Sequence, residues 1–394
     1  MRFAKIGDNA GRVTLHTLLT GFLLVFFLWF VIILVGNVQN LGNLVRVVSI
    51  VRSQHLYSVT TEQLVDGAIK GLVESLEDPY SAYLDPAHFA GLQEQIKGYF
   101  GGLGILVGVR NDNLTVVRTY QETPAHREGI KEGDMIIGID DQEAIGMELD
   151  TAVSLMRGQA GTQVSLLIDR PGEDEPLFFT ITREIISVPT VETQAIEGTE
   201  IWHVTVSQFT ERTGREMQNI LDQIQNEQAQ GIILDLRDNP GGELNAAVEV
   251  AGYFIPQGPV VYIDDRAGRE QVLEAHGPTV QLPLVVLINE GSASASEILA
   301  GAIQDTDSGV LVGASTFGKA VVQTVFRLGD GAGLRLTTAH YLTPARNDIN
   351  EKGIEPDYPV EQDRGNYDDD PQLDKALEII RKMIADESES GDVF

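Results

Sequence analysis

The sequence predicts an α/β protein that carries an inserted β-rich module, preceded by a helical region and one apolar N-terminal segment. Three observations lead to this prediction. Residues 187–360 alternate between short apolar runs typical of buried strands and amphipathic runs typical of helices. Residues 99–184 instead combine glycine turns with short strand-like runs. Leu18–Val35 is almost entirely apolar and contains no Asp, Glu, Lys or Arg, so it is long enough to cross a bilayer as a helix.

The apolar segment is expected to be an uncleaved membrane anchor. No small-residue cleavage signal follows it at Gly36–Val38. Basic residues flank both ends of the segment: Arg2, Lys5 and Arg12 before it, Arg46 and Arg52 after it. The slight excess before the span favours a cytoplasmic N-terminus. Residues 1–12 are therefore expected to be a short cytoplasmic segment, 13–38 the anchor, and the remainder extracytoplasmic.

Residues 39–98 are expected to form a helical region. Apolar residues recur every four positions through Thr60–Leu76, which predicts an amphipathic helix capped by one of its two leading threonines. Asp78–Ser81 contains a proline and ends that helix. Asp85, followed by proline, is expected to begin another helix that ends near Gly98.

Residues 99–185 are expected to form a small β-rich domain. A glycine-rich loop, Gly101–Gly104, leads into an apolar strand. Further strands are expected at Leu114–Val117, Met135–Ile139, Val164–Ile168 and Leu177–Ile181, with a helix at Leu149–Met156.

This module resembles a PDZ domain. The resemblance rests on the glycine-rich loop followed in order by Thr123–Ala125, Gly129–Ile130, Gly133–Asp134, and Arg157–Gly158 with Gly161–Thr162. In a PDZ domain the loop holds the C-terminal carboxylate of a peptide that adds a strand to the sheet. The resemblance implies a peptide-binding role for Gly101, Gly102, Leu103, Gly104 and Ile105. It also makes Arg157 a candidate for sensing bound substrate, with an ordinary surface arginine as the alternative.

The α/β region, residues 186–362, is expected to contain strand–helix units. Its predicted strands are Trp202–Val206, Gly231–Leu236, Leu284–Ile288 and Gly309–Val312, and its predicted helices are Thr213–Gln228, Glu243–Phe254 and Ser294–Gln304. Val321–Leu328 and Gly333–Thr338 alternate like a hairpin. Residues 363–394 are expected to contain a helix at Gln372–Ala385 and a disordered acidic tail, Asp386–Asp392.

Ser294 is the candidate nucleophile. It stands at the predicted start of a helix that follows a buried strand, where backbone N–H groups and the helix dipole favour a developing negative charge. The alternative is structural, because Ser294–Glu297 also reads as a capping box. Ser292 and Ser296 remain rival nucleophiles, since helix boundaries predicted from sequence are approximate.

Lys319 is the candidate general base. Gly313–Ala320 nearly matches a phosphate-binding loop, but Ala320 replaces the hydroxyl that would hold Mg²⁺, and Val321–Phe326 reads as a strand instead of a helix. A nucleotide site is therefore disfavoured. Apolar neighbours argue for burial of Lys319, which would lower the pKa of its ammonium as a general base requires.

Other segments could complete this site. Gln323 lies four residues after Lys319, on the same face if the segment is extended, so its amide could orient the amine. Arg237–Gly242 forms a turn after a buried strand, at the sheet edge where α/β proteins place ligands. Glycine N–H groups there, Gly241 or Gly242, could stabilise an oxyanion together with the N–H of Ala295.

Together these residues resemble the carboxyl-terminal processing peptidases, an exported S41 serine protease family with a Ser–Lys dyad. The resemblance runs from about Tyr57 to Val360. It rests on Asp66–Ala68, Asp78–Ser81, Tyr83–Asp85, the PDZ module, Leu236–Gly242, Gly291–Glu297, Phe317–Lys319 with Gln323, and Gly353–Asp357. One departure is Ala320–Val321, where the family has a glycine and a small polar residue.

The resemblance implies a crotonase-like catalytic core and a PDZ domain that binds substrate C-termini and gates activity. Ser294 would be the nucleophile, Lys319 the base and Gln323 its orienting partner; Gly241 or Gly242, with Ala295, would form the oxyanion hole. The expected partners are proteins or peptides with free C-termini and, through the anchor, a lipid bilayer, and self-association into a homo-oligomer is left open. The alternative is an inactive PDZ peptide-binding protein on a protease-like scaffold.

Composition narrows the range of partners and cofactors. The net charge of −30 argues against nucleic acid as a partner. The chain has no cysteine, which excludes disulfides and thiolate metal sites. No two of the seven histidines have the spacing of a helical metal motif. The sequence therefore predicts a hydrolase with neither metal nor cofactor.

Overall fold

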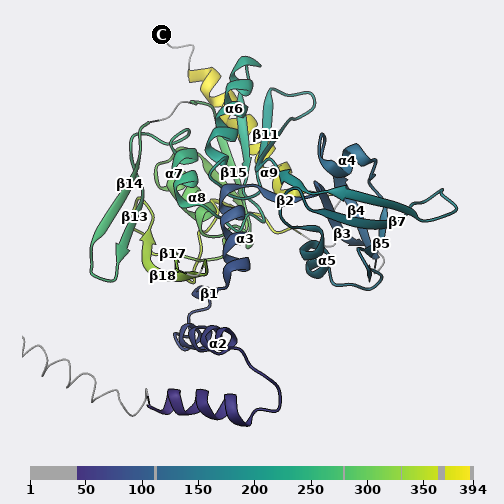
Figure 1. The fold of residues 1–394 in the computed structure, drawn as a ribbon. Coiled ribbons are helices and arrows are strands. Elements are labelled where there is room, and N and C mark those ends of the chain that lie inside the picture. The colour runs from purple at the N-terminus through teal and green to yellow at the C-terminus, as the bar shows by residue number, and fades with distance from the viewer. Residues whose placement is uncertain (1–41, 111–112, 278–279, 330, 363–368, 391–394) are drawn as a thin grey trace, which may run out of the picture. The chain divides into compact units, whose positions relative to one another are not determined.

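The computed structural model describes residues 42–110, 113–277, 280–329, 331–362 and 369–390 (Figure 1). The chain divides into two compact units, Met1–Glu77 and Asp78–Phe394. The expected cytoplasmic segment, 1–12, and the expected anchor, 13–38, lie outside the described residues. Within the described ranges, no helix is both long and apolar enough to cross a membrane.

The first unit is helical where it is described. Residues 42–54 are helical, and α2 spans Thr61–Glu74. Thr60 caps α2: its hydroxyl accepts from the N–H of Gln63 at 3.1 Å, and the Gln63 side chain accepts from the N–H of Thr60 at 3.0 Å. This reciprocal pair is a capping box, which satisfies two donors at the helix start. The predicted helix is confirmed.

The second unit opens with a short strand and a helix. Strand β1 (Ala82–Leu84) leads into α3 (Pro86–Lys97). The Asp85 carboxylate caps α3 by accepting from the N–H of His88 at 2.9 Å. Gly98 ends the helix with a φ of 74°, a left-handed conformation that glycine adopts without strain. Both predicted boundaries of this helix are confirmed.

The β-rich domain follows the predicted order. Its sheet has the strand order β3-β4-β5-β7-β8, with β6 paired to β5, and β2 pairs with β9. The strands are β2 (Phe100–Gly102), β3 (Ile105–Arg110), β4 (Asn113–Thr119), β5 (Met135–Ile139), β6 (Gln142–Glu143), β7 (Gln163–Asp169), β8 (Leu177–Thr182) and β9 (Glu184–Ile186). Helix α5 (Leu149–Met156) and the short α4 (Pro124–Glu128) complete the domain. Its core is built from alternating strand residues such as Leu114, Val116, Ile136, Leu166, Ile168 and Ile181.

A second sheet forms the centre of the α/β region. Its strand order is β10-β11-β12-β15-β16-β19, and all neighbours beyond the antiparallel β10–β11 pair are parallel. These strands are β10 (Val191–Ala195), β11 (Ile201–Val206), β12 (Gly231–Asp235), β15 (Leu284–Ile288), β16 (Val310–Gly313) and β19 (Tyr358–Pro359). The helices between and after them are α6 (Thr213–Asn226), α7 (Leu244–Ala251), α8 (Ala295–Asp305) and α9 (Pro371–Ser390).

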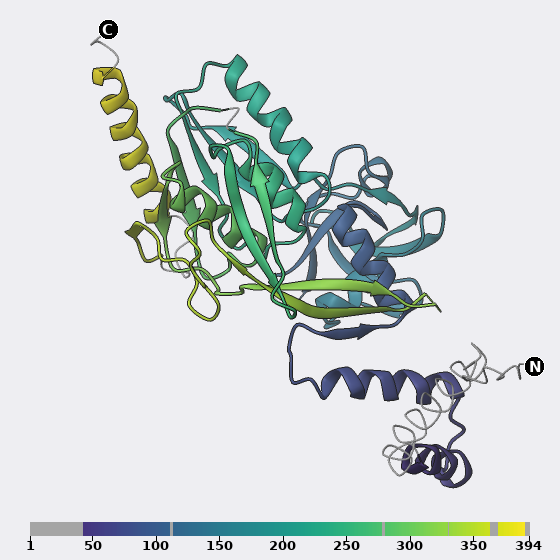
Figure 2. The ribbon, with the colours of Figure 1, turned by 90° about the vertical axis from the view of Figure 1, so that its left-hand side faces the viewer.

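Both faces of this sheet are covered, which explains its continuous apolar strands. On β12, Ile232 and Leu234 pack with residues of α6, α7 and α8, whereas Ile233 packs with residues of α9. Figures 1 and 2 show α9 on the face opposite α6. A strand buried on both faces has no polar face to alternate with its apolar one.

A further sheet joins distant segments of the chain (Figure 2). Its order is β1-β18-β13-β14, with β17 also paired to β18. The strands are β13 (Gly258–Asp265), β14 (Glu270–Ala275), β17 (Val321–Arg327) and β18 (Gly333–Leu342). Strand β1 pairs antiparallel with β18, with Ala82 opposite Arg335. This pairing places β1, near the start of the second unit, beside β18. Strand β18 also pairs with β17, the strand that follows Lys319.

Some features depart from the sequence prediction. Strands β1 and β10 and the β13–β14 hairpin were not predicted. The acidic tail was expected to be disordered from Asp386, but α9 continues to Ser390. Glutamate has a good helix propensity, and a helix already anchored by packing extends by one more turn at little cost.

Candidate active site

Ser294 lies between β15 and α8, at the N-cap of the helix. Its backbone has φ 56° and ψ −111°, outside the regions that non-glycine residues normally occupy. Such strain persists only where surrounding contacts hold it, and it concentrates at functional sites. Ser294 lines a cavity of about 390 Å³ between α7, α8 and β17.

The rival serines are excluded as nucleophiles by their burial and bonding. The side chains of Ser292 and Ser296 are both fully buried. The Ser292 hydroxyl donates to the carbonyl of Leu236 at 2.8 Å, and that of Ser296 donates to the carbonyl of Asn239 at 2.9 Å. Of the three serines, Ser294 is the one that lines the cavity.

Glu297 connects the serine segment to the lysine segment. Its carboxylate is fully buried and accepts four hydrogen bonds among the described residues. Oε2 accepts from the backbone N–H groups of Ser294 at 2.8 Å and Lys319 at 2.9 Å. Oε1 accepts from the hydroxyl of Thr316 at 2.6 Å and the N–H of Gly318 at 2.7 Å. The glutamate half of the capping box is therefore present, and the same carboxylate also binds residues about twenty positions downstream.

Tyr341 makes a second connection between the same segments. Its hydroxyl oxygen lies 3.2 Å from the carbonyl oxygen of Ser294 and 2.5 Å from that of Lys319. Burial, and then the nearby Glu297 carboxylate, raises the pKa of Tyr341, so the phenol stays protonated and remains a donor. The two backbones are thus fixed side by side.

The side chain of Lys319 contacts an aromatic ring. Its amine lies 4.5 Å from the centroid of the Tyr80 ring, and among the described residues no hydrogen bond joins it to Ser294. Burial lowers the pKa of Lys319, and the charge of Arg335 lowers it further. Glu297 and Asp78 oppose this shift without cancelling it. The backbones of Ser294 and Lys319 are therefore held together by Glu297, while among the described residues their side chains share no hydrogen bond.

Gln323 lines the Ser294 cavity from β17. Its amide donates to the carbonyl of Val321 at 3.2 Å, and a bulge separates Val322 from Gln323 in the pairing with β18. The expected contact between Gln323 and Lys319 is therefore not formed in this arrangement. The simple two-residue alternation that placed both on one face is broken by the bulge.

The two glycines of the Arg237–Gly242 turn differ in their surroundings. Gly241 is buried, and its N–H donates to Asn239 Oδ1 at 2.9 Å. A Cβ at Gly241 would lie 2.9 Å from the Cβ of Ser294, so only glycine fits there. Gly242 is exposed and lines the cavity with Ala295. Gly242 and Ala295 are therefore better placed than Gly241 to bind an oxyanion.

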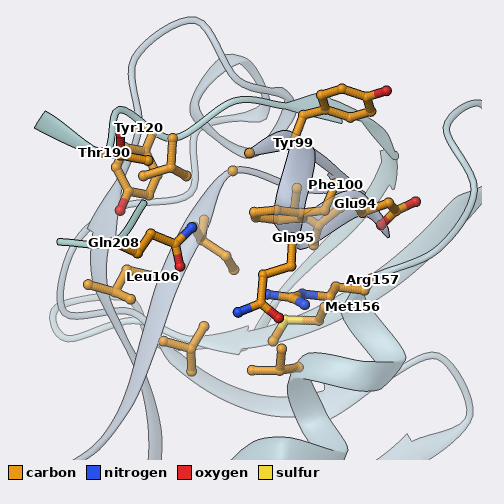
Figure 3. Close-up of a pocket in the computed structure, with 18 of the residues that line it drawn as sticks. Glu94, Gln95, Tyr99, Phe100, Leu106, Tyr120, Met156, Arg157, Thr190 and Gln208 are labelled. Atoms are coloured by element: carbon orange, nitrogen blue, oxygen red, sulfur yellow. The ribbon is translucent and has the colours of Figure 1, made fainter. Parts of the chain in front are cut away.

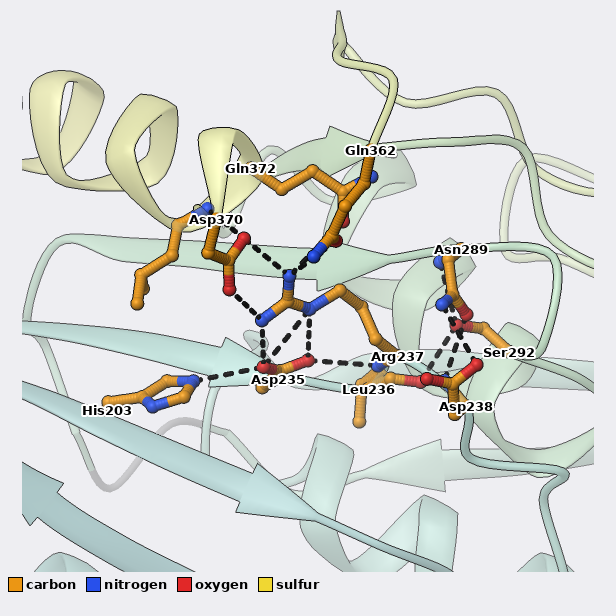
Figure 4. Close-up of polar contacts among 11 residues, drawn as sticks. His203, Asp235, Leu236, Arg237, Asp238, Asn289, Ser292, Gln362, Asp370 and Gln372 are labelled. Atoms are coloured by element: carbon orange, nitrogen blue, oxygen red, sulfur yellow. Dashed lines mark hydrogen bonds and ion pairs between the residues drawn. The ribbon is translucent and has the colours of Figure 1, made fainter. Parts of the chain in front are cut away.

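The same turn is held from the other side by a buried ionic network (Figure 4). The guanidinium of Arg237 is 2.7 Å from Asp235 and 2.8 Å from Asp370, which lies just before α9. His203 lies 3.0 Å from the other side of Asp235. Burial raises the pKa of Asp235, but hydrogen bonds from His203 and Arg237 outweigh it and leave the pKa lowered. The C-terminal helix is thereby tied to the turn that carries the glycines.

Removing Arg237 is expected to destabilise the fold strongly. Arg237→Ala leaves Asp235, whose side chain is 8% exposed, without its cation, and should lower the free energy of unfolding by about 3–5 kcal/mol. Denaturant unfolding measures the loss. Arg269→Ala is the control, because its side chain is 82% exposed and its ion pair is expected to contribute less than about 1 kcal/mol. Because the folded-state pKa of Asp235 is lowered, the difference should persist above pH 3.8 and fade as the pH falls below that value. Equal losses in the two variants would contradict a structural role for the network.

The expected peptide-binding residues lie around a second cavity, of about 510 Å³ (Figure 3). Gly102, Leu103, Gly104 and Ile105 line it. Gly101 does not: it lies in β2, where a Cβ would approach the carbonyl oxygen of Gly158 to 2.0 Å. Its role is close packing of two backbone segments.

Arg157 lies in the wall of this cavity, with its guanidinium 4.5 Å from the centroid of the Phe100 ring. Residues outside the β-rich domain complete the wall: Gln95 from α3, and Thr190 and Gln208 from the α/β region (Figure 3). These three residues were not predictable as part of the peptide-binding site, because they belong to other elements. A ligand in the groove would therefore contact the catalytic region directly.

Comparisons with known proteins agree with this architecture. Residues 200–360 match peptidase family S41, residues 95–169 match the PDZ domain, and residues 35–87 match the activating protease CtpB N-terminal domain. A carboxy-terminal-processing protease of Bartonella bacilliformis is 41% identical over 319 residues, which cover 79% of this chain and 73% of the relative. A carboxyl-terminal-processing protease of Synechocystis is 36% identical over 329 residues, which cover 81% of this chain and 77% of the relative.

A solved S41-type structure from Bacteroides fragilis matches with a TM-score of 0.54 at 16% identity, over 85% of this chain and 96% of that chain, which shows a shared fold. The resemblance inferred from the motifs is confirmed: the chain has a mixed α/β protease core, a PDZ domain and an N-terminal helical domain. The chain therefore belongs to the carboxy-terminal-processing serine proteases of peptidase family S41.

Proposed function

We propose that this protein is a membrane-anchored endopeptidase that acts outside the cytoplasm and cleaves proteins near their C-termini, with Ser294 as nucleophile and Lys319 as general base. The observation that carries the proposal is the Glu297 carboxylate, which binds the backbone N–H groups of both residues. A neutral amine beside a serine hydroxyl is sufficient to generate a nucleophile. The half-buried position of Lys319 favours the neutral amine.

The chemistry follows from these positions. The amine of Lys319 takes the proton of the Ser294 hydroxyl as Oγ attacks the substrate carbonyl carbon. The N–H groups of Gly242 and Ala295 stabilise the negative oxygen of the tetrahedral intermediate. The Lys319 ammonium then protonates the leaving amine, and water hydrolyses the acyl-enzyme by the same steps in reverse. In this proposal Gln323 orients the amine once it has turned toward Ser294.

The lack of a hydrogen bond between the Ser294 and Lys319 side chains among the described residues supports a latent resting state. The Lys319 amine lies against Tyr80, while Ser294 and Gln323 share the cavity. We assign activation to the PDZ domain, which would bind the C-terminus of a substrate in the groove formed by Gly102–Ile105. Because Thr190 and Gln208 of the catalytic region also line that groove, a bound peptide would act on both domains.

The remaining parts of the proposal rest on sequence. The apolar segment 13–38 would anchor the chain, with the catalytic part outside the cytoplasm. The repeated strand–helix units support a crotonase-like assignment of the catalytic core. The substrates would be proteins with free C-termini.

The proposal is tested by cleavage of an unfolded reporter protein with an apolar C-terminus. The purified full chain, in detergent, should cut this reporter near its end, as mass spectrometry of the products would show. A matched reporter ending in two aspartates should be cut more slowly, because the groove is largely apolar in its lining. Binding of the apolar C-terminus without cleavage at any pH would instead support an inactive peptide-binding protein.

The rate of cleavage is expected to rise with pH. Only the neutral amine of Lys319 accepts a proton, so kcat/KM should increase as the pH passes the pKa of this group. Burial lowers that pKa, so the midpoint should lie below the 10.5 of a free lysine. A steady-state profile from pH 6 to pH 10 measures it. A rate that falls across this range would contradict lysine as the base.

A further inference from the structure

Tyr80 is the feature of this site that the catalytic chemistry leaves unexplained. It lies just before β1, far in sequence from the catalytic residues, yet its ring centroid is 4.5 Å from the Lys319 amine. That distance is within the range of a cation–π interaction. This contact engages the Lys319 amine, which the proposed reaction needs beside Ser294.

The backbone of Tyr80 is held in place by hydrogen bonds. The N–H of Tyr80 donates to the Asp78 carboxylate at 3.0 Å, and its carbonyl accepts from the Arg335 side chain at 3.0 Å. The next residue, Ser81, accepts from the N–H of Thr337 at 3.1 Å. The pairing of β1 with β18 continues this attachment. The backbone that carries the ring is therefore anchored to β18.

A ring face discriminates between the two forms of the lysine side chain. The negative face of an aromatic ring attracts an ammonium but gives a neutral amine no comparable electrostatic stabilisation. The other charged groups that act on Lys319 are Arg335 of β18, Glu297 of α8 and Asp78 before β1. Arg335 disfavours the ammonium, whereas both carboxylates favour it. The ring acts with the two carboxylates to favour the ammonium form of Lys319. It does so in a position where the amine is not hydrogen-bonded to Ser294.

We propose that Tyr80 is a positioning residue that holds the protonated side chain of Lys319 away from Ser294 in the resting enzyme. Catalysis then requires release of the side chain from the ring, together with loss of its proton. The inference rests on the proposed dyad, because it assigns a resting position to the base of that dyad.

Replacing the ring tests this role. Tyr80→Leu should raise the basal kcat/KM at neutral pH by about 3- to 30-fold, the range of cation–π energies expressed as an equilibrium constant. The midpoint of the pH–rate profile should move to lower pH. Tyr80→Phe keeps the ring and should restore the wild-type profile. Tyr358→Leu, which removes a ring 5.9 Å from the amine of a different lysine, Lys375, is the matched control and should also keep the wild-type midpoint. Thermal melting shows whether each variant is folded.

A measurement independent of proteolysis separates this proposal from the proposed function. The Lys319 amine can be titrated by NMR in protein carrying ¹³C-labelled lysine, with Lys319→Arg to assign the signal. Its pKa should be lower in Tyr80→Leu than in wild type or Tyr80→Phe, whether or not the chain cleaves the reporter. An unchanged titration, or a pH–rate profile that is the same in Tyr80→Leu and Tyr80→Phe, would overturn the inference. Absence of cleavage with a shifted titration would reject the proposed function and retain the contact.

Discussion

Ser294→Ala and Lys319→Ala are each expected to lower kcat/KM by at least about 10³-fold, and the double variant no further than the worse single variant. Residues that act as one catalytic unit show such non-additivity, because either loss removes the same step. Activity that remains would come from substrate binding and the oxyanion donors alone. The measurement is steady-state cleavage of the apolar-tailed reporter. Lys375→Ala, on α9, is the control for loss of an unrelated lysine.

Two results would contradict the dyad. Full activity in either single variant would show that the residue is not needed for the chemistry. Multiplied losses in the double variant would show that Ser294 and Lys319 act in separate steps. Melting temperatures close to the wild-type value would show that the losses are not caused by unfolding.

Glu297→Gln is expected to cost both stability and activity. The carboxylate accepts from four donors, whereas an amide has one acceptor oxygen and would present its NH₂ group to donors on the other side. Two buried donors left without acceptors should lower the free energy of unfolding by about 2–4 kcal/mol. Displacement of the segments that carry Ser294 and Lys319 should lower kcat by about 10²-fold.

Denaturant unfolding and reporter cleavage together test this prediction. Glu227→Gln makes the same chemical change at an exposed residue beyond α6 and should alter neither quantity. If Glu297→Gln has a lower free energy of unfolding but keeps the wild-type kcat, the carboxylate stabilises the fold without positioning the dyad. An unchanged free energy of unfolding would show that its four hydrogen bonds contribute little.

Elements with local signals were predictable from the sequence. The helices that begin at Thr60 and Asp85 carry their own caps, and the helix after Asp85 ends at a glycine with positive φ. Strands of the α/β core were predictable because burial on both faces makes them continuously apolar. Strand β1 was not predictable, since three residues carry too short a pattern and its partner β18 lies about 250 positions away.

The residues of the candidate site differ in the same way: some have a local sequence signal, and others depend on tertiary contacts. Ser294 and Lys319 were identified because each lies in a distinctive local segment. Glu297 was noticed only as a helix cap, because its other partners lie 19–22 positions further on. The choice between Gly241 and Gly242 depends on which N–H is already bonded, and the resting position of Lys319 depends on Tyr80. Both are properties of tertiary contacts that spacing along the chain does not encode.

The shared carboxylate of Glu297 also affects when the proposed active site can form during synthesis of the chain. Glu297 leaves the ribosome before the segment Thr316–Lys319 that supplies three of its hydrogen-bond donors. Until that segment has been synthesised, the carboxylate lacks these three donors and its burial is unfavourable. The strained backbone of Ser294 then lacks contacts that stabilise it. Under the proposed dyad, the conformation of Ser294 therefore forms only together with the segment that carries Lys319, and a nascent or partly unfolded chain would lack a competent nucleophile.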